Sequence, residues 1–219
     1  GALAGDAITS GLYNTVVGYD ALSAEDGHGT NTAIGAFALK TLNAGADAYN
    51  VAIGYDAGAT ITTGTSNTLI GGFAGDALTT GLYNIAIGRN ALSAEDAHGY
   101  NVAIGSFALL NQNAGTDAHN VAIGHLAGTT ITTGAYNTLV GSYTGDALTT
   151  GARNVAVGFN ALTSEDGNGY TVAVGYEALK SQNAGAEAYN VAVGYQAGLS
   201  VSTGIHNTLI GAFAGDNLA

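Results

Sequence analysis

The chain lacks several residue types that commonly define a protein's chemistry. Its 219 residues include no cysteine, proline, methionine or tryptophan. Without cysteine, disulfide bonds and thiolate catalysis are excluded. Positive charge is scarce as well: four lysines and arginines stand against sixteen aspartates and glutamates, which gives a formal net charge of −12. Nucleic acids and anionic membrane surfaces require a basic surface, so neither is expected as a partner.

Long hydrophobic runs are also missing. Glycine, asparagine or aspartate interrupts every apolar stretch well short of the roughly 18 residues that a membrane-spanning segment needs. We therefore expect no membrane insertion. The apolar fraction is nevertheless 47%, which is enough to bury a core built from small and β-branched side chains.

What the sequence has in abundance is repetition. Within a unit of about 70 residues, a short apolar phrase opens four times with asparagine, first at Asn14, Asn31, Asn50 and Asn67, at spacings of 17 or 19 residues. A fixed apolar phrase at such a period predicts a stack of similar turns. We expect a single domain over 1–219, all-β, folded as a parallel β-solenoid of about twelve turns. Its super-repeats are 11–80, 81–150 and 151–219, preceded by a partial turn at 1–10.

Each phrase predicts a short strand that is apolar on both faces. In Val51-Ala52-Ile53, the two large residues share one face and the alanine takes the other. We expect the Val/Ile face, with Ile53 and Ile123 in its column, to point into the core. A strand that is apolar on both faces is usually covered on both. The second face therefore predicts a partner chain, in a homotrimer or in an axial homopolymer.

Asparagine and glycine occupy fixed columns of the repeat. A glycine stands four positions after each asparagine position, which indicates a positive φ or a close approach of neighbouring backbone. The asparagines either form a hydrogen-bonded structural ladder along the stack or serve only as turn residues. The column has one exception, Thr171. Its asparagines are Asn14, Asn31, Asn50, Asn67, Asn84, Asn101, Asn120, Asn137, Asn154, Asn190 and Asn207.

Core volume and large rings follow a second pattern. Turns ending in Ala-Gly supply their apolar residue three positions later, at Ile61 and Leu78. Rings alternate between two neighbouring positions, as in Tyr19 and Phe37, so that successive rings do not lie directly above one another. The third super-repeat departs from this alternation at Tyr176.

The repeated phrases resemble those of a known family. NVAIG at Asn50, Asn101 and Asn120, NTAIG at Asn31 and NVAVG at Asn190 are similar to the NSVAIG-type repeats of trimeric autotransporter adhesin heads and to repeats in bacteriophage tail-fibre proteins. The resemblance implies a left-handed parallel β-roll of three chains about one axis. It also implies an extracellular location, on a cell surface or on a virion tail fibre.

The acidic residues form columns that could carry chemistry. A paired-carboxylate active site is disfavoured, because the same acids recur in every super-repeat whereas an active site is normally assembled once. We expect no enzyme and no cofactor. Calcium, which prefers carboxylate and carbonyl oxygens, is the alternative to a solvated acidic edge, and no histidine or cysteine motif indicates another metal. These acids are also expected to belong to a contact surface, in the pairs Glu25 and Asp26, Glu95 and Asp96, and Glu165 and Asp166.

A column of aromatic residues precedes the asparagines. These rings either form an exposed row that contacts a cell-surface glycan or host receptor, or pack on one another and stiffen an edge. The tyrosines of this row are Tyr13, Tyr49, Tyr83, Tyr100, Tyr136, Tyr170 and Tyr189.

These patterns together predict a non-catalytic structural or adhesive segment of an extracellular fibre. A self-assembling filament of stacked solenoids is the alternative, and an ice- or calcium-binding solenoid is less favoured. Recognition is expected in the variable loops that follow the Ala-Leu turns, such as 23–29 and 40–49.

Overall fold

The computed structural model describes residues 1–218. In each turn, one short strand begins directly after the residue of the asparagine column. Each strand has three residues, and no residue of 1–218 is helical. The strands are β1 (Thr15–Val17), β2 (Thr32–Ile34), β3 (Val51–Ile53), β4 (Thr68–Ile70), β5 (Ile85–Ile87), β6 (Val102–Ile104), β7 (Val121–Ile123), β8 (Thr138–Val140), β9 (Val155–Val157), β10 (Val172–Val174), β11 (Val191–Val193) and β12 (Thr208–Ile210).

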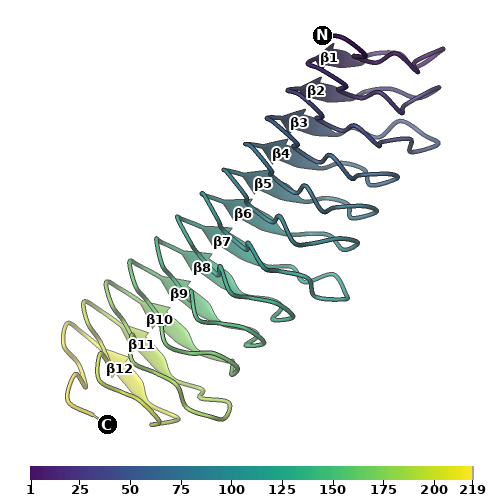
Figure 1. Cartoon of the computed structure of the whole chain (residues 1–219). Helices are drawn as coiled ribbons and strands as arrows, with labels where there is room; N and C mark the ends of the chain where they lie inside the picture. Colours follow the sequence, from purple (N-terminus) through teal and green to yellow (C-terminus); the bar gives the residue numbers. More distant parts are fainter. Residues whose placement is uncertain (219) are drawn as a thin grey trace. The chain divides into compact units, whose positions relative to one another are not determined.

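The strands stack in parallel and in register. The chain forms two compact units, Gly1–Ser106 with Gly115–Asp117, and Phe107–Ala114 with the chain from Ala118 onward. Within the first unit β1 to β6 pair in chain order, and within the second β7 to β12 do the same. Within each unit a strand lies beside the next one, and the rest of its turn loops away and returns (Figure 1). The predicted all-β parallel solenoid, with one strand per turn, is thereby confirmed.

The strand face that points into the solenoid is the opposite of the one predicted. The central residues are fully buried, for example Ala52 and Leu69, whereas their neighbours on each strand are partly exposed. Ile123 is 36% exposed. The prediction that Ile53 and Ile123 face the interior is therefore wrong. The reason is the buried asparagine: Asn50 and Ala52 lie on the same side of an extended chain, so placing the amide inside also places the alanine there.

The interior is filled from the turns as well as from the strands. Ile61 and Leu78 are fully buried, as predicted from the Ala-Gly turns. Where the central residue of the strand is the larger Leu69, glycines lie next to its side chain, Gly58 in the preceding turn and Gly75 in the same turn. A Cβ at Gly58 would lie 2.7 Å from a methyl carbon of Leu69, and one at Gly75 would lie 2.8 Å from the other methyl. Large and small residues therefore compensate between successive turns.

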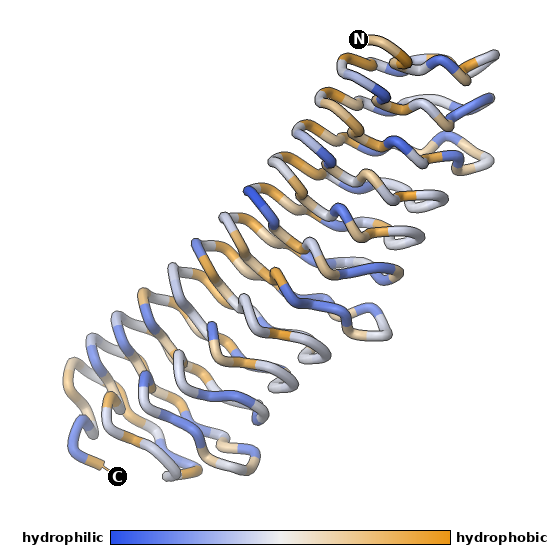
Figure 2. The backbone as a smooth tube through the Cα atoms, in the orientation of Figure 1, coloured by the Kyte–Doolittle hydropathy of each residue, from blue (hydrophilic) through white to orange (hydrophobic). Residues whose placement is uncertain are grey.

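The glycine after each strand is required by close backbone contact. Gly54 has a φ of +146°, and a Cβ placed there would lie 2.4 Å from the carbonyl oxygen of Gly71 in the next turn. No side chain fits at that distance, so both predicted reasons for the glycine column apply at this position. Hydrophobic and hydrophilic segments follow one another along the turns of both units (Figure 2).

Ring packing follows the alternation seen in the sequence. Tyr19 and Phe37 occupy different positions of their turns and meet edge to face, with centroids 5.4 Å apart and planes at 90°. Where the third super-repeat abandons the alternation, Tyr176 stacks on Phe159 at 13° and on Tyr195 at 7°. Both arrangements are favourable for aromatic pairs, so the change of pattern alters ring geometry without breaking the column.

Candidate binding surfaces and the acidic loops

The asparagine column forms a buried hydrogen-bond network rather than a contact surface. Asn67 accepts the backbone N–H of Asn84 through Oδ1 at 3.0 Å, and its Nδ2 donates to the carbonyl of Gly81 at 2.8 Å. Asn50 Oδ1 likewise accepts the backbone N–H of Asn67 at 2.9 Å. The links between turns thus run mainly from side chain to backbone, in contrast to the amide-to-amide ladder of cross-β stacks. Asn14 and Asn207, at the two ends of the column, are only half-buried.

Thr171 interrupts this network, and a glutamine from a loop bridges the interruption. The backbone N–H of Thr171 still donates to Asn154 Oδ1 at 3.1 Å, but its hydroxyl accepts a hydrogen bond from Gln182 Nε2 at 3.0 Å. Gln182 Oε1 in turn accepts from Asn190 Nδ2 at 2.7 Å. No separate signal in the sequence indicated this role of the loop glutamine.

The tyrosine row is exposed and also stacked. Tyr170 and Tyr189 have ring centroids 5.1 Å apart, and Tyr189 stacks on His206 at 5.3 Å. Exposure along the row nevertheless ranges from 39% at Tyr170 to 84% at Tyr13. The two sequence alternatives therefore do not exclude each other, because rings that support one another still present edges and hydroxyl groups to solvent.

One cation is inserted into this row. The guanidinium of Arg153 lies over the rings of both Tyr136 and Tyr170, at 5.6 and 5.3 Å from their centroids, and Nη1 donates to the Tyr170 hydroxyl at 3.1 Å. This geometry combines cation–π attraction with a hydrogen bond. It gives the second unit a platform of aromatic and cationic groups, a chemistry that suits sugars and carboxylates.

The acidic pairs divide into a buried and an exposed residue. Glu25 is fully buried, and its Oε1 accepts the backbone N–H of His28 at 3.0 Å, which closes the loop. Asp26 is exposed. The same division holds in the other super-repeats, where Glu95 and Glu165 are buried while Asp96 and Asp166 are exposed. The expectation that the three glutamates belong to a contact surface is therefore wrong, and only the aspartate of each pair can contact a partner.

A second acidic column has a structural role between turns. Asp47 Oδ1 accepts the backbone N–H of Gly29 at 3.0 Å, and Asp117 and Glu187 do the same for Gly99 and Gly169. Because each carboxylate satisfies a buried backbone donor of the preceding turn, these acids link the 19-residue loops to the body of the stack.

The surroundings of the buried glutamate differ between super-repeats. Glu165 accepts from Gln182 Nε2 through Oε2 at 3.0 Å and from Asn168 Nδ2 through Oε1 at 3.1 Å. In the first super-repeat, Leu42 stands in the place of Gln182 and His28 in the place of Asn168. The Oε2 atom of Glu25 is buried and has no hydrogen-bond partner. The sequence analysis placed the acids in columns, but it did not recognise that the residue beside the buried glutamate changes from leucine in the first super-repeat to glutamine in the third.

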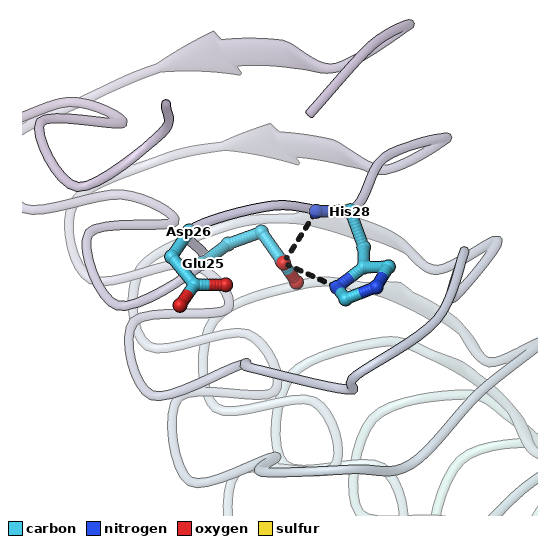
Figure 3. Close-up of side chains that lie close together, drawn as sticks. All are labelled: Glu25, Asp26 and His28. Atoms are coloured by element: carbon cyan, nitrogen blue, oxygen red, sulfur yellow. Dashed lines mark hydrogen bonds and ion pairs between the residues drawn. The ribbon is translucent and has the colours of Figure 1, made fainter. Parts of the chain in front are cut away.

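Two of the loops bring potential metal ligands together. Ligand atoms of Glu25, Asp26 and His28 all lie within 4.8 Å of one another, and those of the Glu95, Asp96 and His98 group do so as well. In Figure 3 the Glu25 carboxylate lies between Asp26 and the imidazole of His28, and one of its oxygens faces the ring nitrogen Nδ1 at 3.7 Å. The third loop has no histidine.

Four other carboxyl groups have displaced pKa values. Burial raises the pKa of Asp76 and of Asp146, and the Oδ1 atom of each lies buried without a hydrogen-bond partner. A hydrogen bond and ion pair with Lys40 at 2.9 Å lower the pKa of Asp20, and Lys180 at 2.7 Å lowers that of Glu177. The lysine of each pair is exposed to solvent and the carboxylate only partly so, and such pairs at the surface contribute little to stability.

No enclosed cavity accompanies these groups. Within residues 1–218 neither unit contains a pocket, and no helix there could cross a lipid bilayer. Comparison with known proteins adds no assignment: no family model, curated protein or solved structure matches the chain.

Proposed function

We propose that the chain is a non-catalytic structural segment of an extracellular fibre, in which three copies pack through the outward face of their strands. The outward Val/Ile face carries this proposal. It comprises the first and third residues of the twelve strands, which are valine, isoleucine or threonine throughout.

This outward face is apolar and incompletely covered. Ile85 and Val193 are 37% exposed and Ile123 is 36% exposed, and the same face recurs on every turn of each unit. A single exposed valine needs no explanation, but a contiguous apolar surface of this kind marks an interaction site. Burying it would release about 25 cal/mol for each Å² removed from water.

Charge argues that the occupant is another copy of the chain. Each chain carries a formal net charge of −12, so identical chains repel one another through most surfaces. The Val/Ile face has no charged residue in any strand, so it is where two copies can approach at the lowest electrostatic cost. A closed ring of copies satisfies all such faces at once. Three copies is the number implied by the resemblance to adhesin heads and tail-fibre repeats.

The exposed groups supply the adhesive part of the proposal. The variable loops after the Ala-Leu turns, and the tyrosine row with Arg153, are the surfaces left for a cell-surface glycan or a host receptor. Their repetition along the chain would give weak individual contacts the advantage of multivalency. Assembly along the fibre axis, in a filament of stacked chains, is the second arrangement that the same fold permits.

The test is the mass of the particle in dilute solution. Multi-angle light scattering should give three chains per particle for the full chain. A variant with Ile53→Lys and Ile87→Lys places two charges on the Val/Ile face of the monomer, where the lysine stems lie along the apolar surface and the ammonium groups remain in water. It should give monomers that retain the β spectrum. Asn43→Lys, on an exposed loop, is the matched control and should remain trimeric. A wild-type chain that is monomeric, or a face variant that is still trimeric, would refute the proposal.

A further inference from the structure

Glu25 is fully buried, and one of its carboxylate oxygens has no hydrogen-bond partner. Its Oε1 is used by the N–H of His28, but Oε2 has no donor within reach. Burying an ionised carboxylate oxygen without a partner is costly. The site therefore calls for a cationic or donor group that the folded chain itself does not supply.

The third super-repeat shows what a satisfied version of this loop looks like. There, Gln182 donates to Oε2 of Glu165, and Asn168 donates to Oε1 through its backbone and its side chain. Two of the differences in the first super-repeat fall on the residues that donate to the glutamate: the donor glutamine becomes Leu42, and the asparagine becomes His28. The first change removes the donor, and the second adds an imidazole next to the same carboxylate.

Imidazole and carboxylate together form a typical ligand set for a transition metal. The Nδ1 atom of His28 is buried, has no hydrogen-bond partner, and lies 3.7 Å from Glu25 Oε1. Asp26 completes a group whose ligand atoms lie within 4.8 Å of one another. Ligands around zinc are separated by about 3.3 Å, given bonds of about 2.0 Å in tetrahedral geometry. Rotation of the exposed Asp26 side chain toward Glu25 is the movement that would bring the group to that spacing (Figure 3).

We propose that Glu25, Asp26 and His28 bind one divalent transition-metal ion, with zinc as the ion of best fit. A nitrogen ligand with two carboxylates favours zinc, copper or nickel over calcium and magnesium, which prefer sites built from oxygen alone. The three protein ligands leave the fourth zinc position for water or for a group from another molecule. The surplus of negative charge on the chain raises the local concentration of cations. The ion would neutralise the buried carboxylate and fix the loop.

The proposal concerns the first loop. The Glu95, Asp96 and His98 group has its ligand atoms in similar proximity, and the Oε1 atom of Gln112, which stands there in the place of Leu42, accepts a hydrogen bond from Asn120 Nδ2 at 2.7 Å. His98→Asn isolates the first loop, because it converts the second loop toward the histidine-free sequence of the third and leaves the first intact.

The test is a zinc titration of the full chain by isothermal calorimetry, with circular dichroism as a check of folding. His98→Asn should bind one zinc ion per chain at the first loop. Adding His28→Asn, the residue present in the third loop, should weaken that binding at least tenfold without loss of the β spectrum.

Three results would overturn the proposal. The first is no zinc binding by His98→Asn, which would leave His28 and Glu25 as a direct ion pair. The second is equal affinity in the presence and absence of His28, which would assign the binding to the exposed histidines elsewhere. The third is calcium binding at this loop without zinc binding, which would contradict the choice of metal.

Discussion

Asn67 Oδ1 accepts the backbone N–H of Asn84 at 3.0 Å, although 17 residues separate the two along the chain. The spacing equals one turn of the solenoid, so a single side chain links two successive turns. Asn67 also donates to the carbonyl of Gly81 and to Asn50 Oδ1, all in the buried interior. The network depends on amide groups, which can donate and accept at the same time.

Replacing Asn67 by alanine should therefore be strongly destabilising. The change leaves the N–H of Asn84 and the carbonyl of Gly81 buried without these partners, and each such group costs about 1 to 3 kcal/mol. We expect a loss of about 2 to 5 kcal/mol in the free energy of unfolding, measured by chemical denaturation. Asn43→Ala, at an exposed loop position, should change stability by no more than about 0.5 kcal/mol. Equal effects of the two substitutions would show that the buried network contributes nothing.

The orientation of the strands makes a second prediction. Ala52→Asp buries an unpaired charge inside the solenoid and should cost more than about 3 kcal/mol, which is measurable as a large fall in melting temperature. Ile53→Asp places the same charge on the partly exposed outward face and should cost the monomeric fold much less. If Ile53→Asp is the more damaging of the two in a monomeric background, the assignment of strand faces is incorrect.

The sequence alone predicted the repeat, the twelve strands and the volume compensation at Ile61 and Leu78, because each follows from periodicity and residue size. The prediction of which strand face points inward was wrong. Val51, Ala52 and Ile53 are all apolar, so hydrophobicity does not distinguish the two faces of the strand. The buried Asn50 makes that choice, and an asparagine is ordinarily assigned to the surface. The hydrogen bond between Gln182 and Glu165 could not be predicted either, because a contact between residues 17 apart is recognised only when the register of the turns is known.

The buried carboxyls of Asp76 and Asp146 predict an unusual dependence of stability on pH. Burial raises their folded pKa above the unfolded value of 3.8, so at neutral pH the charged forms oppose folding. This destabilising contribution becomes smaller as the pH falls from neutral through the raised pKa toward 3.8, because the folded state then binds the protons. Asp76→Asn with Asp146→Asn should therefore raise the melting temperature at pH 7, and this gain should shrink as the pH approaches 4.

Asp20 provides a control of opposite sign. Lys40 lowers its folded pKa below 3.8, so the stability it contributes is present above pH 3.8 and is lost as the pH falls through the lowered value. Asp20→Asn should give a small loss at pH 7 because the pair is exposed. A double asparagine variant that is less stable than wild type at pH 7, with a deficit that grows on raising the pH, would contradict the role of burial at Asp76 and Asp146.

Recognition by the loops can be tested without damaging the fold, provided that the replaced segment is chosen from the structure. Replacing the whole of 40–49 would remove the buried Leu42 and Ala48 and the Asp47 contact to Gly29. The segment 43–46 is free of such roles: its residues are exposed or half-buried, and nothing lies within 4 Å of a Cβ built at Gly45.

Replacing 43–46, 113–116 and 183–186 by Gly-Ser sequences should leave melting temperature and particle mass nearly unchanged. We predict that these replacements abolish binding of the fibre segment to cells or to a glycan array, and that neither protein turns over any glycan. A parallel variant carrying Tyr170→Ala and Arg153→Ala removes the aromatic and cationic platform and keeps the loops. Undiminished binding by the loop variant, together with loss in the platform variant, would transfer recognition to the tyrosine row. Its repeated exposed rings would then be the adhesive surface, and the loops would act as spacers.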